Sequence, residues 1–162
     1  MKKIFKVATL IMMLFFATNA DAQWRISKIP ADELKGTKEH YANIYESSSG
    51  YFVCWNDGAN LKIVCNEGIF KPTAFSVVCI IGLYEGDRLV KKYNKVHFTL
   101  GDNYDTATMF DRFALGQRVI EHLQKKGKVR IIAPRHGKID FDITIPMNKD
   151  IKYDPPQAPL FY

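Results

Sequence analysis

The stretch that decides the fold runs from Asn103 to Pro146 and reads NYDTATMFDRFALGQRVIEHLQKKGKVRIIAPRHGKIDFDITIP. It contains an apolar pattern with helical spacing, a glycine stop, and two segments in which apolar and polar residues alternate. Apolar residues that recur every three or four positions favour an amphipathic helix, whereas strict alternation favours a strand with one buried face. The pattern therefore predicts one helix followed by a β-hairpin.

The predicted helix spans about residues 105–126. Asp105 has the side chain of an N-cap residue, because a carboxylate accepts a hydrogen bond from an otherwise unpaired amide of the first turn. Asn103 is the competing choice. Gly127 follows two lysines, as is typical of the C-terminal end of a helix. The apolar face consists of Met109, Phe113, Gly116, Ile120 and Leu123, and the polar face of Asp111, Arg118, Glu121, His122 and Lys125.

The hairpin is predicted from residues 128–133 and 139–145, joined by the loop 134–138. One register places all apolar residues on one face and an ion pair on the other. A shift by a single residue would destroy both matches. The predicted pairs are Ala133 with Ile139, Ile131 with Phe141, Val129 with Ile143, and Arg130 with Asp142.

Ahead of residue 103, short apolar runs alternate with turn signals, as is typical of antiparallel strands. The run 75–84 is apolar on both faces like a central strand, and lysines in the run 89–100 suggest an edge protected from pairing. Short connections and a single helix favour a mainly β fold, an antiparallel β-sandwich or partly open barrel with the helix packed on it. The predicted strands are 24–29, 40–45, 51–56, 61–65, 75–84 and 89–100.

The chain begins like a secretory signal. Three lysines precede the apolar run 7–17, and Ala20 and Ala22 place small residues at positions −3 and −1 before Gln23. The run is shorter than the roughly 20 apolar residues of a spanning helix. We expect cleavage after Ala22 and a periplasmic or secreted protein without a transmembrane segment; a retained N-terminal anchor is the alternative. The expected parts are a signal peptide (1–22), one β-rich domain (23–153) and a proline-rich extended or disordered tail (154–162).

A tryptophan-bearing first strand, a hairpin carrying Cys54 and Cys65, one helix and a closing hairpin follow one another along the chain. In outline, this order resembles secreted β-proteins of the invasion-associated locus B type. The resemblance implies a secreted β-rich fold. It includes no specific motif, so it assigns no role to any residue.

Charge points to the class of partner. Removal of the signal would take away three lysines and Asp21, so the formal charge would fall from +6 to +4. An exported chain does not normally meet nucleic acid, so no nucleic-acid partner is expected. Acidic glycans or lipid headgroups fit a mildly basic exported protein better, and an envelope protein is the other expected partner.

Three cysteines, Cys54, Cys65 and Cys79, are an odd number for an oxidising compartment. We interpret them as buried thiols that act as small hydrophobes, with one bridge that includes Cys79 as the alternative. A nucleophilic Cys54 with His97 or His136 as base and Asp57 as orienting group is conceivable. A hydrophobic strand is a poor place for a thiolate, however.

Motifs for cofactors and metals are missing from the sequence. The four histidines have no metal-ligand spacing, and no phosphate-binding loop or nucleophile elbow occurs. We therefore expect no cofactor, no metal and no catalytic residue. Asp140 and Asp142 lie two apart and resemble a paired acid site, but Lys128 and Arg130 on the neighbouring strand favour a surface ion-pair ladder instead.

Basic residues gather around the second hairpin and form the best candidate binding site. Its loop could capture a carboxylate or sulfate group, while a solvated basic face is the alternative. A second candidate is a sugar-stacking or protein-binding surface of aromatic residues. The basic candidates are Lys125, Lys128, Arg130, Arg135, His136 and Lys138, and the aromatic ones are Tyr41, Tyr45, Tyr51, Trp55 and Tyr84.

The sequence thus predicts a non-catalytic binding or interaction module of the periplasm or cell exterior, with an acidic glycan or a protein as ligand. The alternative is a cell-envelope enzyme or enzyme inhibitor whose pocket is assembled across strands.

Overall fold

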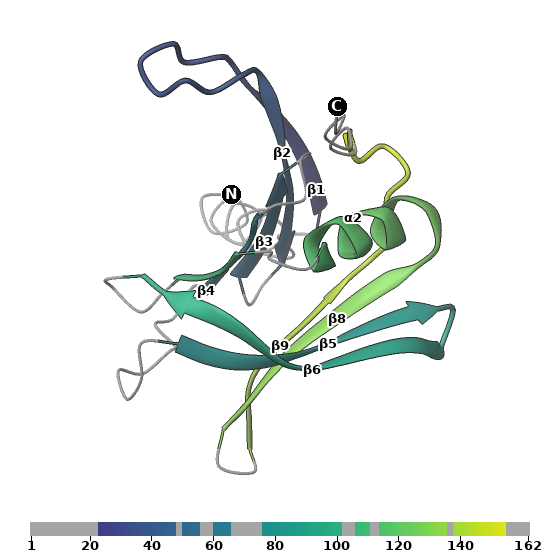
Figure 1. Cartoon of the computed structure of the whole chain (residues 1–162). Coiled ribbons are helices and arrows are strands. Elements are labelled where there is room, and N and C mark those ends of the chain that lie inside the picture. The colour runs from purple at the N-terminus through teal and green to yellow at the C-terminus, as the bar shows by residue number, and fades with distance from the viewer. Residues whose placement is uncertain are drawn as a thin grey trace, which may run out of the picture.

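The computed structural model describes residues 23–47, 50–55, 60–65, 76–101, 106–110, 114–135 and 138–154. In these ranges nine strands form one antiparallel sheet that curves into a half-barrel, and one helix packs against it (Figure 1). The predicted mainly β fold with a packed helix is confirmed, as a partly open barrel. The signal 1–22 and the tail from residue 155 lie outside the described residues.

Apart from residues 106–110, the observed strands agree closely with the predicted ones. In chain order the elements are β1 (Gln23–Ile29), β2 (His40–Ser47), β3 (Gly50–Trp55), β4 (Asn60–Cys65), β5 (Ser76–Glu85), β6 (Arg88–Leu100), β7 (Thr106–Phe110), α2 (Leu115–Lys125), β8 (Lys128–Arg135) and β9 (Lys138–Ile145). The order of strands in the sheet is β1-β2-β3-β4-β7-β6-β5-β8-β9.

The sheet has two halves, β1-β2-β3-β4-β7 and β6-β5-β8-β9, which meet where β7 pairs with β6. β7 pairs with β4 over five residues, but it pairs with β6 only at Thr99 and Leu100. The remainder of β6 pairs with β5 alone among the described strands. β5 is therefore a central strand, as predicted, and β6 combines a short inner part with a long lysine-bearing edge. The helix lies between the two halves (Figure 1).

The helix is shorter than predicted, because the segment Thr106–Phe110 is strand β7. Ala107 and Met109 are buried, whereas Thr106 and Thr108, which alternate with them, are only half-buried. This period of two matches a strand, and β4 supplies its partner. The predicted N-cap at Asp105 is wrong: α2 begins after Ala114, a left-handed residue with φ of 55° and no side-chain cap.

A single core fills the space between the helix and the sheet. Helix α2 contributes three side chains that are entirely inaccessible to solvent, and both halves of the sheet contribute the others. Because burial of apolar area is the dominant stabilising term in folding, this core holds the two halves together. Its largest fully buried side chains include Phe52, Leu61, Ile63, Ile81, Phe98, Val119, Ile120, Leu123, Ile131 and Ile145.

Two side chains tie the ends of the half-barrel together. The Trp24 indole of β1 donates a hydrogen bond to the carbonyl of Pro146, just after β9, at 3.1 Å. Asn43 of β2 is fully buried, and its amide pairs with both backbone groups of Lys152, at 3.0 and 2.9 Å. The Asn43 side chain thus takes the place of a neighbouring strand and fixes the segment after β9.

β8 and β9 form the predicted hairpin, but in a register shifted by two residues from the predicted one. Val129 faces Ile145, Ile131 faces Ile143, and Ala133 faces Phe141. The predicted pairs are therefore wrong, although an even shift leaves these apolar side chains on their predicted face. The strands extend further into the loop than expected, to Arg135 and Lys138, and an irregularity after Ala133 accommodates the difference.

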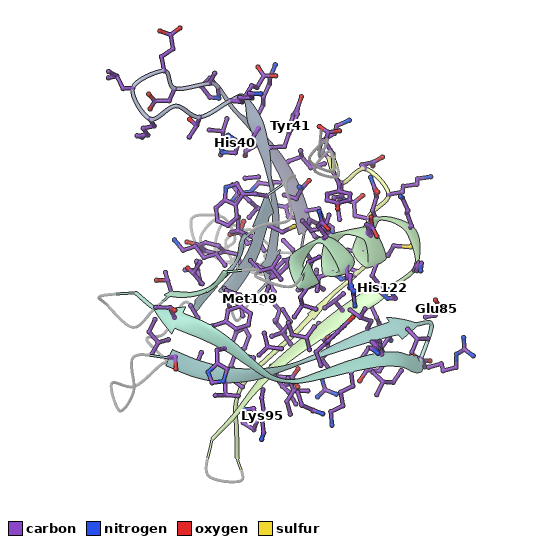
Figure 2. All side chains as sticks on the ribbon, in the orientation of Figure 1. His40, Tyr41, Glu85, Lys95, Met109 and His122 are labelled. Carbon is purple, nitrogen blue, oxygen red and sulfur yellow. The ribbon has the colours of Figure 1, made fainter. Side chains whose placement is uncertain are left out.

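The C-terminal turn of α2 rests on the end of β5. His122, which was predicted on the polar face, is buried there instead, and its Nε2 donates to the Tyr84 carbonyl at 2.9 Å (Figure 2). Gly127 follows the helix as predicted, but its φ is not positive. A side chain at this position would overlap the Tyr84 carbonyl oxygen. The glycine is thus required by close backbone approach rather than by a left-handed conformation.

We predict that Gly127→Ala lowers the free energy of unfolding by about 2 kcal/mol, because the added methyl group must push α2 away from β5. Urea denaturation measures this change. Gly101→Ala is the matched control, since its methyl group would meet chiefly the side chain of Thr106, which can rotate. Equal losses in the two variants would contradict the close approach described here.

Candidate ligand-binding site

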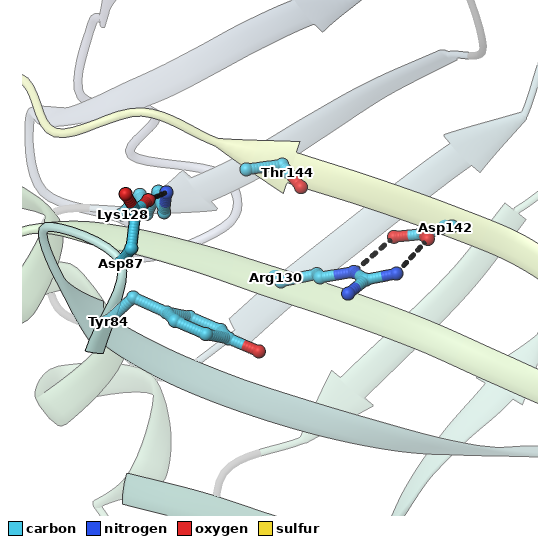
Figure 3. A pocket seen from close by; sticks show the side chains of 6 residues that line it. All are labelled: Tyr84, Asp87, Lys128, Arg130, Asp142 and Thr144. Atoms are coloured by element: carbon cyan, nitrogen blue, oxygen red, sulfur yellow. Dashed lines mark hydrogen bonds and ion pairs between the residues drawn. The ribbon is translucent and has the colours of Figure 1, made fainter. Parts of the chain in front are cut away.

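A pocket of about 420 Å³ opens on the outer face of the half-barrel, over β5, β8 and β9 (Figure 3). Alternate residues of a strand point to opposite faces of a sheet. Burial of Val129 and Ile131 in the core therefore places Lys128 and Arg130 outside. The pocket is lined by Tyr84, Asp87, Lys128, Arg130, Asp142 and Thr144.

Arg130 and Asp142 form a two-pronged ion pair across β8 and β9. The Nε of Arg130 donates to Oδ1 of Asp142 at 2.9 Å, and a terminal nitrogen donates to Oδ2 at 2.5 Å. The Asp142 carboxylate raises the pKa of Arg130, and the Tyr84 phenol adds to this effect. Because exposed ion pairs contribute little to folding, the main effect of this geometry is to hold both groups in a fixed orientation.

A second ion pair joins β8 to the turn between β5 and β6. The ammonium group of Lys128 donates to Asp87 at 2.8 Å. This hydrogen bond and the charge of Lys128 lower the pKa of Asp87. The same ammonium group lies 5.9 Å from the centre of the Tyr84 ring. Each cation of the pocket thus has its own carboxylate, and the charges of these four groups cancel.

The Tyr84 ring occupies space that a side chain at position 82 would otherwise fill. Gly82 precedes it by two residues on the same face of β5, and a side chain there would come within 2.9 Å of Cε2 of Tyr84. It would also come within 3.2 Å of Leu89. In the sheet, Gly82 is opposite Arg130 and Tyr84 is opposite Lys128. The absent side chain therefore lets the ring settle on the strand between the two ion pairs.

The structure brings together only part of the predicted basic site. Lys128 and Arg130 line the pocket, whereas Lys125 is exposed at the last residue of α2 and does not line it. The side chains of Arg135 and Lys138, and all of His136, lie outside the described residues. The ion-pair ladder predicted for Asp142 is confirmed with Arg130, but Lys128 pairs with Asp87.

Sequence reasoning missed Asp87, Thr144 and the link between Tyr84 and the basic residues. Tyr84 was one of the aromatic candidates, but the others on β2 and β3 do not line this pocket. The available signal was the short Glu85-Gly86-Asp87 turn after a strand with glycine at position 82. That signal indicates a pocket with Lys128 and Arg130 only when the pairing of β5 with β8 is known.

The described cysteines agree with their interpretation as small buried hydrophobes. Cys54 and Cys79 are both buried, and the side chain of Cys65 lies outside the described residues. Desolvation by burial raises the pKa of Cys54. The thiol is therefore held in its protonated form, which disfavours Cys54 as a nucleophile.

No group of three or more His, Cys, Asp or Glu side chains comes together as a metal site within the described ranges. His122 is used in the core contact with β5. His40 makes a hydrogen bond of 2.9 Å with the carbonyl of Lys38. Both histidines thus form hydrogen bonds with backbone carbonyl groups.

A second pocket, of about 450 Å³, lies where the segment after β9 crosses α2 and β2. Gln124 of the helix donates to the carbonyl of Ile151 there at 2.9 Å. Tyr41 of β2 and residues 149–154 complete its walls. Its walls depend on the segment fixed by Asn43. Among the described residues, no ion pair joins two side chains of this pocket, in contrast to the first one.

Comparison with known proteins assigns no family. No family model matches the chain, and no curated protein and no solved structure matches it significantly. The outline resemblance to the invasion-associated locus B type therefore gains no support. Among the described elements, no helix has the length and apolar character required to cross a bilayer.

The lowered pKa of Asp87 gives a testable pH dependence. Because its pKa is lowered from the ordinary Asp value of 3.8, the Asp87 carboxylate is still ionised at pH 3.8. The pair with Lys128 is therefore fully formed at higher pH and is lost as the pH falls through the lowered pKa. We predict that Lys128→Met returns the midpoint towards 3.8 in a carbon-detected NMR titration. Arg130→Gln should leave it unchanged. Identical midpoints in the wild type and Lys128→Met would refute the assignment.

Proposed function

We propose that the chain is an exported, non-catalytic binding module that recognises a saccharide in the outer-face pocket. The main support for this proposal is the position of the Tyr84 ring, which lies over Gly82. Two ion pairs flank the ring and hold hydrogen-bond donors and acceptors in place. Export is supported by the signal-like residues 1–22. The pocket itself accounts for the proposed class of ligand.

Saccharides combine two properties that this pocket complements. Their C–H faces pack on aromatic rings, and their hydroxyl groups both donate and accept hydrogen bonds. Tyr84 offers the ring, Arg130 and Lys128 offer donors, and Asp142 and Asp87 offer acceptors. Ligand sites commonly combine an apolar surface with a few well-placed polar groups.

Charge balance narrows the class of saccharide. Because the two cations and two carboxylates of the pocket pair with each other, little net charge remains to attract a sulfate or carboxylate. A neutral saccharide therefore suits this pocket better than the acidic glycan expected from the sequence. The acidic-glycan alternative depends on the basic residues of the loop between β8 and β9.

The ionisation of the pocket favours binding over hydrolysis. A glycosidase needs one carboxylic acid with a raised pKa to protonate the leaving group. Asp87 has a lowered pKa, because Lys128 stabilises its ionised form. Asp142 is held by two hydrogen bonds from Arg130. Asp87 is thus better suited to accept hydrogen bonds from hydroxyl groups than to donate a proton, and Asp142 is already engaged by Arg130.

We predict that Tyr84→Ala weakens saccharide binding by roughly tenfold or more, because the stacking surface is lost. Affinity electrophoresis of the mature chain in gels containing β-glucan, xylan, mannan or heparin measures the retardation. Tyr41→Ala, which removes a tyrosine from the second pocket, is the matched control. The wild type should be retarded by a neutral polysaccharide, and Tyr41→Ala should behave like it.

Retardation by none of the neutral polysaccharides, or equal retardation of Tyr84→Ala and the wild type, would refute the proposal. The acidic-glycan alternative predicts a different result. It requires retardation in heparin that the double variant Arg135→Glu, Lys138→Glu abolishes while Tyr84→Ala leaves it intact.

A further inference from the structure

The connection between β1 and β2, residues 30–39, projects from the half-barrel as an arm (Figure 1). It joins β2 at His40 and Tyr41, and its side chains point into open space (Figure 2). Every residue of the arm is exposed except Asp32, which is half-buried. Leu34 at the tip has a relative exposure of 101%, so its entire side chain is in solvent.

Backbone hydrogen bonds, rather than core contacts, hold Leu34 in place. Asp32 and Thr37 exchange two backbone hydrogen bonds of 3.0 Å, which close the turn. The Asp32 carboxylate also accepts from the amides of Leu34 and Lys35, at 3.1 and 3.3 Å. Gly36 supplies the positive φ of 64° that the turn requires. The tip is therefore organised before any contact with a partner, which lowers the entropic cost of binding.

The charges of the arm balance when Lys28 at the end of β1 is counted with it. Lys28 pairs with Glu39 at 3.0 Å, and Lys35 pairs with Asp32 at 3.3 Å. Glu33 and Lys38 are the remaining charged residues between positions 28 and 39, and they are of opposite sign. A segment without net charge is not drawn to anionic lipid or nucleic acid, because such attraction depends on excess Lys and Arg. Shape and apolar burial remain as its means of recognition.

We propose that the arm is a docking element whose Leu34 side chain inserts into an apolar pocket of a second, different protein. The pocket of the partner protein would accommodate one leucine side chain and would have polar groups around its entrance that contact the neutral turn. A second copy of this chain is a poorer partner, because the two described pockets are lined mainly by charged and polar groups. A bilayer is also a poorer partner, since one leucine gives little membrane affinity.

The test uses the mature chain with benzoylphenylalanine at position 34, and the same probe at Leu89 as the control position. Leu89 is another exposed leucine, on β6, with a relative exposure of 45%. After ultraviolet irradiation in an envelope extract of the producing cells, position 34 should yield one discrete protein adduct that position 89 does not. Unlabelled wild type and Leu34→Met should compete for it, whereas Leu34→Asp should not.

The cross-linked partner is then identified by mass spectrometry, produced separately and titrated by calorimetry. Leu34→Asp should weaken its affinity roughly tenfold or more, as expected for the loss of a buried leucine, and Leu89→Asp should change it less than twofold. The proposal is overturned by the absence of an adduct specific to position 34. It is also overturned by an adduct with a second copy of this chain, by competition from Leu34→Asp, or by Leu34-dependent sedimentation with phosphatidylglycerol vesicles.

Discussion

Burial of one face of α2 between the two halves of the curved sheet is the interaction on which the rest of the structure depends. In the described part of the chain, strand pairing joins the halves only where β6 meets β7 at Thr99 and Leu100. The contacts of Trp24 and Asn43 add side-chain hydrogen bonds at the far ends. Val119, Ile120 and Leu123 of the helix fill the space between the halves and are fully buried. Removing that apolar area from water stabilises the whole half-barrel at once.

The packing of the helix also positions the outer-face pocket. The C-terminal turn of α2 rests on the Tyr84 carbonyl through His122 and Gly127, and β8 begins directly after it. Where the helix ends therefore determines which residues of β8 lie opposite Gly82 and Tyr84. Because the core occupies the inner face, Lys128 and Arg130 lie on the outer face. There they meet Tyr84 and Asp87, which are distant from them in the sequence.

The strands were predictable because alternation of apolar and polar residues has a period that a helix cannot reproduce. The start of the helix was not, because Met109 fits both a helical face and the buried face of β7; only the presence of β4 decides between them. The hairpin register failed by two residues because an even shift preserves both faces. Asp87 and Tyr84 joined Lys128 only through the pairing of β5 with β8, which local patterns do not specify.

The core closes the inner face of the sheet, and we propose that the outer face of β5, β8 and β9 is the binding surface. Titration of the isotope-labelled mature chain with an oligosaccharide from the retarding polysaccharide, followed by amide chemical shifts, tests it most directly. The account predicts the largest shifts at Tyr84, Arg130 and Thr144, with α2 unaffected. Shifts centred on Gln124 and Ile151 of the second pocket, or on the buried face of α2, would contradict it.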